Sequence, residues 1–151
     1  MLKSLATLLF FRSFSRRFPR SARRGTLRTE TPLTRLDLPP TLSAHLGCDA
    51  VGFPARHGFR LLGGLPRYGC VFADTDWWWW IVPAGSDLEL TWPLPSHYAR
   101  GAYVPAVNPR LIRRPDDTSP YTPPIPLYLM ACQLTGTAPR WTAGVGGARS
   151  A

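Results

Sequence analysis

Apolar and polar positions are patterned most clearly in the middle of the chain. Two apolar runs, Gly69–Ala73 and Trp77–Val82, flank the turn-forming residues 74–76, which predicts a β-hairpin. Farther along, Leu88–Trp92 alternates apolar and polar residues as a half-buried strand does. Three strands in sequence predict an antiparallel meander.

Shorter β-type segments lie on both sides of this region. Phe59–Leu62 is a candidate strand that ends at a pair of glycines. Ala102–Val104 and Arg110–Arg113 are separated by a proline-containing loop and predict a second hairpin, with the prolines in the loop or on an edge.

Two segments have features of helices. Ile125–Leu134 has apolar residues at largely helical spacing, Pro126 in its first turn and Gly136 just past its end. Thr41–Leu46 follows two prolines and precedes Gly47, which predicts one or two helical turns. The fold class is therefore α+β, with a small antiparallel sheet of about four to five strands and a C-terminal helix.

Charge divides the chain into two parts. The net charge is +9, and the first 35 residues hold nine basic residues and one acidic residue, a net +8, which leaves +1 for the remainder. A segment so basic and so poor in periodic apolar positions does not build a core. We predict a disordered basic arm over residues 1–37, a single α+β domain over 38–141 and a disordered tail over 142–151.

The arm is the part of the chain predicted to attract anions, because arginine clusters bind phosphates through paired hydrogen bonds. Its partners are nucleic acid or an acidic membrane surface, bound weakly and without specificity. An alternative is a mitochondrial presequence, which residues 1–28 resemble in composition. The apolar run over residues 2–11 is too short to span a bilayer, so no transmembrane segment is predicted. The arm's anion-binding candidates are Arg12, Arg16, Arg17, Arg20, Arg23 and Arg24.

Three widely spaced cysteines cannot complete a disulfide framework, which favours a reducing compartment. Cys70 and Cys132 lie in apolar runs and are predicted to be small core residues. The core sequence, notably Trp77–Ser86 and Tyr121–Tyr128, resembles a family of small actinobacterial proteins of unknown function over residues 46–141. The resemblance implies one domain and a bacterial cytoplasm.

Motifs for chemistry are scarce. His45 and Cys48 form one closely spaced pair of metal ligands without a second, so we predict no metal and no cofactor. The close carboxylates at 74 and 76, and at 116 and 117, fall in predicted turns, where aspartate commonly caps its own backbone. A non-enzymatic role is favoured, and the alternative is a small enzyme that uses carboxylates with His97 near the sheet.

Four consecutive tryptophans need a separate explanation. In a strand, Trp77 and Trp79 face one side and Trp78 and Trp80 the other. One interpretation is a sheet buried on both faces; the other is a partly exposed aromatic platform. The platform, with Arg67 and Arg113 as further candidates, would serve a non-enzymatic binding or regulatory module that contacts an unknown protein or ligand.

Overall fold

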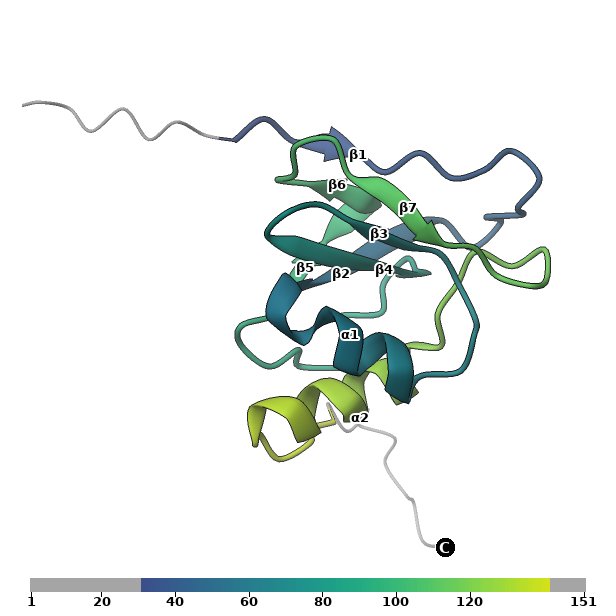
Figure 1. The fold of residues 1–151 in the computed structure, drawn as a ribbon. Coiled ribbons are helices and arrows are strands. Elements are labelled where there is room, and N and C mark those ends of the chain that lie inside the picture. Colours follow the sequence, from purple (N-terminus) through teal and green to yellow (C-terminus); the bar gives the residue numbers. More distant parts are fainter. Residues whose placement is uncertain (1–30, 142–151) are drawn as a thin grey trace, which may run out of the picture. The chain divides into compact units, whose positions relative to one another are not determined.

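An antiparallel five-stranded sheet forms the centre of residues 31–141, the part of the chain described by a computed structural model (Figure 1). The strand order is β5-β2-β4-β3-β7. The α+β prediction is confirmed. The arm over residues 1–30, with its six candidate arginines, and the tail over 142–151 lie outside the described residues. The strands are β2 (Cys48–Pro54), β3 (Val71–Ala73), β4 (Trp77–Pro83), β5 (His97–Ala99) and β7 (Arg110–Arg113).

The hairpin predicted around residues 74–76 is present as β3 and β4. Asp74 closes its turn, since its Oδ1 accepts the backbone N–H of Asp76 at 2.9 Å and that of Trp77 at 2.6 Å. The carboxylate thus replaces the ladder partners that these amides lack at the turn. Local side-chain chemistry therefore favours this hairpin.

Strand β2 was not predicted, although it is the longest partner of β4. It pairs with β4 from Cys48 opposite Pro83 to Pro54 opposite Trp77. Its sequence lacks clear alternation because both of its faces are buried. The short helix predicted over Thr41–Leu46 is wrong. The segment contains two separate turns, in which Leu42 N–H donates to the carbonyl oxygen of Pro39 and Gly47 N–H donates to that of Ala44.

The strand predicted for Phe59–Leu62 is also wrong, because these residues belong to helix α1 (Ala55–Gly64). Gly58 and Leu61 face the interior, whereas Phe59 and Arg60 are exposed, which is the one-sided burial of a surface helix. Three glycines in ten residues lower the helical propensity and hide this pattern in the sequence. Tertiary packing outweighs propensity here.

The third strand of the predicted meander does not form. Leu88–Trp92 is not a strand, and only Leu90 makes a single bridge, to Trp141. The meander therefore ends after β4.

The second predicted hairpin is wrong as well, because its two strands join different sheets. After the short η1 turn (Arg100–Ala102), β6 (Tyr103–Val104) pairs with β1 (Thr34–Arg35), and β7 pairs with β3. The compact unit begins at Thr31 and has Leu36 in its core, ahead of the Leu38 at which the composition placed its start.

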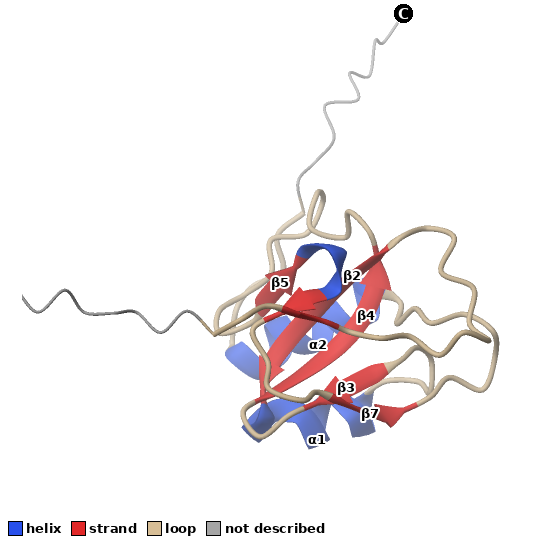
Figure 2. Ribbon diagram, turned by 90° about the horizontal axis from the view of Figure 1, so that it is seen from above, coloured by secondary structure: helices blue, strands red, loops and turns tan. Residues whose placement is uncertain are grey.

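The C-terminal helix is confirmed as α2 (Pro124–Thr135). Gly136 adopts a left-handed conformation at φ 65° and donates its N–H to the carbonyl oxygens of Cys132 and Gln133 in the last turn, as expected of a glycine that ends a helix. Figure 2 shows α1 and α2 together on one face of the sheet. Neither helix in residues 31–141 combines the length and the apolar character needed to cross a membrane.

Both faces of the sheet are covered, and the tryptophans alternate between them. Trp78 and Trp80 pack toward the helices. Trp79 packs on the opposite face of the sheet, in a cluster with Leu36 and with Val104 of β6. Trp79 and Trp80 are fully buried, Trp78 is 8% exposed and Trp77 is half-buried. The interpretation of a sheet buried on both faces is therefore confirmed.

Candidate functional site

A groove with a volume of about 720 Å³ lies between α1 and β7. Helix α1 supplies an apolar wall, the loop after it supplies Arg67, and β7 with the residues that follow supplies two more arginines. The groove is lined by Phe59, Leu62, Gly63, Leu65, Arg67, Ile112, Arg113, Arg114 and Asp116.

Arg113 is the most constrained cation of the groove. Its guanidinium donates to the carbonyl oxygens of Leu62 and Tyr68, each at 3.4 Å, and its buried Nε has no hydrogen-bond partner. Burial lowers the pKa of Arg113, and the positive charge of nearby Arg67 lowers it further. Two like charges thus stand close together at a site that is partly shielded from water.

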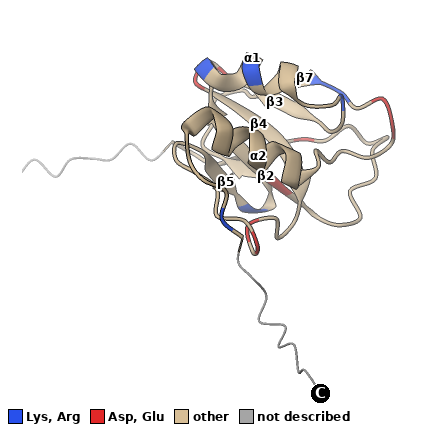
Figure 3. Cartoon of the chain, turned by 90° about the horizontal axis from the view of Figure 1, so that it is seen from below, with Lys and Arg blue, Asp and Glu red and all other residues tan. Residues whose placement is uncertain are grey.

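No acidic side chain in the described part of the chain forms an ion pair with either arginine. Within residues 31–141 the only ion pair joins Arg100 to Asp87, at 2.7 Å, and lies at the β5 edge of the sheet. Asp116 lines the groove but forms no ion pair there. Figure 3 shows the basic positions on α1 and at the end of β7. The groove carries three arginines and one aspartate, so it favours an anion.

The groove also offers apolar surface. The Phe59 side chain is 77% exposed and its ring meets the edge of the Trp78 ring, with 4.8 Å between centroids. Ile112 on β7 is 45% exposed. Exposed apolar side chains beside arginines fit a ligand that combines anionic groups with an apolar part.

Of the predicted surface residues, the structure brings Arg67 and Arg113 together in one groove. It does not place the tryptophans with them as a platform, because three of the four are in the interior. Phe59 and Arg114 also line the groove but are not among the site residues predicted from the sequence. A helical assignment for residues 55–64 would have revealed Phe59 as an exposed aromatic on a polar helix face.

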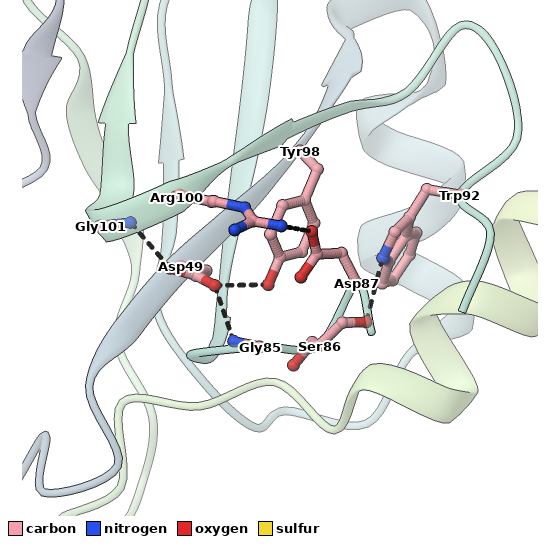
Figure 4. A network of polar contacts seen from close by, with 8 residues as sticks. All are labelled: Asp49, Gly85, Ser86, Asp87, Trp92, Tyr98, Arg100 and Gly101. Carbon is pink, nitrogen blue, oxygen red and sulfur yellow. Dashed lines mark hydrogen bonds and ion pairs between the residues drawn. The ribbon is translucent and has the colours of Figure 1, made fainter. Parts of the chain in front are cut away.

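A second polar cluster surrounds Asp49 at the other edge of the sheet (Figure 4). Its buried carboxylate accepts the N–H of Gly85 at 2.8 Å, the N–H of Gly101 at 2.7 Å and the Tyr98 hydroxyl at 2.6 Å. Burial raises the pKa of Tyr98, and the bond to Asp49 raises it further. The carboxylate accepts three hydrogen bonds from within the protein and so connects β2 to β5, to η1 and to the turn at Gly85. We interpret this as a structural role.

The side chains considered for catalysis or metal binding lie apart. Asp74 caps its turn and borders a hollow with Asn108 and Arg110, whereas His97 packs edge-on against Trp77 and Trp79. In the part of the chain that the structure describes, no three His, Cys, Asp or Glu side chains gather as metal ligands do.

The cysteines behave as core residues, as predicted for two of them. Cys70 and Cys132 are buried free thiols, and Cys48 is half-buried and also free. Burial raises the pKa of Cys70 to about 11. A thiol with a raised pKa is a poor nucleophile, so Cys70 is a packing residue.

Comparison of the chain with protein-family models, with curated proteins and with solved structures finds no match in any of the three. The functional assignment therefore depends on the geometry of the groove.

Proposed function

We propose that the protein is a non-enzymatic binding module whose ligand site is the groove between α1 and β7. The observation that carries the proposal is that Arg67 and Arg113 line the same groove and that neither has an acidic partner among residues 31–141. An anionic group placed between them relieves the repulsion and accepts charge-assisted hydrogen bonds from the arginines. The tryptophan-rich sheet is the rigid scaffold that holds β7 in position.

The competing class is a small enzyme that uses carboxylates and His97. That function requires an acid and a base that converge on one cavity. Asp74 uses its carboxylate to close a turn, and His97 lies against aromatic rings. The groove instead gathers groups that bind charge, which supports the binding module.

The arm and the compartment complete the proposal. The arginines of residues 1–30 add weak, non-specific attraction to nucleic acid or to an acidic membrane surface, which salt weakens. The cytoplasm is the proposed location, supported by three free cysteines and by the resemblance to small actinobacterial proteins.

Titration of the full chain with tripolyphosphate, followed by NMR, tests the groove. We expect the backbone amide signals of residues 110–114 to shift, and the shift to be lost in Arg67→Ala. Arg140→Ala removes one exposed charge outside the groove and is the matched control, which should bind as the wild type does. Shifts confined to residues 1–30 would place anion binding in the arm and refute the groove.

A further inference from the structure

Strand β7 is at the end of the five-stranded sheet, and among the described residues one of its edges is free. In residues 31–141 it pairs only with β3, so the backbone N–H and C=O groups on its other side have no strand partner. Ile112 and Arg113 belong to this strand and also line the groove, so the free edge runs along the proposed ligand site. An extended peptide can add to such an edge as a further strand.

The side chains around this edge are mainly basic and apolar. Arg67 and Phe59 line the groove, and Arg110 and Val107 border a neighbouring shallow hollow, where the Asp74 carboxylate is engaged in its own turn. Val107 is 70% exposed. This composition complements a strand that carries acidic and apolar residues.

Building on the anion-binding groove proposed above, we propose that the ligand is an acidic, extended segment of a partner protein, which pairs with β7 as a sixth strand. Its backbone satisfies the free edge, its carboxylates meet Arg67 and Arg114, and its apolar side chains cover Phe59 and Ile112.

Two other occupants fit less well. A second copy of this chain, paired β7 to β7, brings the arginines of both copies together, and like charges oppose that contact. A nucleic acid supplies phosphates but no peptide groups, so the free edge of β7 stays unpaired. An acidic peptide meets both requirements.

The test uses the full chain and the octapeptide Glu-Glu-Val-Val-Glu-Glu-Val-Val, which as a strand carries both residue types on each face. Amide hydrogen exchange is measured residue by residue along β7, so that binding to the arm does not contribute. We expect the peptide to slow exchange of β7 amides that exchange freely without it. The same octapeptide with every amide nitrogen methylated keeps the charge but cannot pair, and should leave exchange unchanged.

Charge-reversal variants inside and outside the groove test whether the arginines of the groove bind the octapeptide. In the double variant Arg67→Glu and Arg114→Glu, both exposed positions, we expect the octapeptide to bind at least about tenfold more weakly, because charge-assisted contacts are lost. Arg140→Glu, outside the groove, should stay within about twofold, since exposed distant charges are screened.

Each remaining outcome is decisive. Equal binding of the methylated peptide, or a response to tripolyphosphate but not to the octapeptide, overturns strand addition and leaves the anion-binding groove intact. If neither probe affects residues 110–114, both proposals fail. Tighter binding of a single-stranded oligonucleotide than of the octapeptide at these residues overturns the peptide and assigns the groove to nucleic acid.

Discussion

At the scale of single residues, close packing against the tryptophans is achieved by the absence of side chains. Gly52 lies directly opposite Trp79 in the β2–β4 ladder, and a Cβ at that position would overlap the indole ring. A Cβ on Gly58 of α1 would likewise overlap the ring of Trp78. At both positions the indole ring occupies the space that a side chain would need.

The pair Gly58→Ala and Gly63→Ala tests this explanation in one helix. Gly58→Ala should destabilise the fold by about 1–3 kcal/mol, because the methyl group overlaps the Trp78 ring. Gly63 has nothing within 4 Å of an added Cβ, so Gly63→Ala should stabilise by about 0.4–1 kcal/mol. Urea unfolding measures both, and equal effects would contradict the packing argument.

Cys70 gives a pH dependence with a defined sign. Its pKa is raised from 9.0 to about 11 by burial, so the unfolded chain loses the thiol proton at a lower pH than the folded protein does. Stability should therefore be complete below pH 9 and decline as the pH rises toward 11, by at most about 1.4 kcal/mol per pH unit from this group.

The variant Cys70→Ala isolates that contribution. Its free energy of unfolding should decline less steeply than that of the wild type between pH 9 and pH 10, whatever its stability at neutral pH. Above pH 10 both proteins should lose stability, because the pKa of the half-buried Tyr98 is also raised. Parallel curves over pH 9 to 10 would exclude Cys70 as a titrating group.

At the scale of secondary-structure elements, β4 is the strand on which the fold is organised. It pairs with β2 on one side and β3 on the other, and its side chains enter both halves of the core. A central strand buried on both faces has no tolerant side, in contrast to an exposed aromatic platform.

Single alanine substitutions along β4 distinguish these two arrangements. Trp78→Ala, Trp79→Ala and Trp80→Ala should each cost about 3–5 kcal/mol, the loss typical of a buried aromatic side chain. Trp77→Ala should cost less than the others, because Trp77 is half-buried at the strand end. If the losses instead alternate along the strand, one face of the sheet is more exposed than the structure has it.

At the scale of the whole molecule, the core is built from residues 31–141 and its first contributor is Leu36, which is 3% exposed. Strand β1 pairs with β6 and covers the face of the sheet opposite the helices. The boundary between arm and fold therefore matters for stability.

Two truncations locate this boundary. Deletion of residues 1–30 should leave the melting temperature within about 3 °C, because none of the described core contacts is removed. Deletion of residues 1–37 also removes β1 and Leu36 and should lower it by roughly 5–15 °C. Calorimetry of both proteins provides the measurement. An equal loss in both would show that residues 1–30 contribute to stability.

Features that depend on neighbouring residues are predictable from the amino-acid sequence alone. Asp74 caps the amides two and three positions on, so the β3–β4 hairpin was predictable, as was the end of α2 at Gly136. The alternation of the four tryptophans follows from the period of a strand. Each of these depends on chemistry within a few residues along the chain.

Which segments pair and which side chains come into contact depends on long-range packing. The pairing of β2 with β4, and of β7 with β3, joins residues far apart in the chain, and local pattern contains no information on that choice. The same pairing brings Arg113 beside Arg67, so the groove was not predictable although both arginines had been singled out. The burial of the tryptophans also depends on tertiary packing. The helices cover one face of the sheet and β1 covers the other, and neither contact is visible in the local sequence.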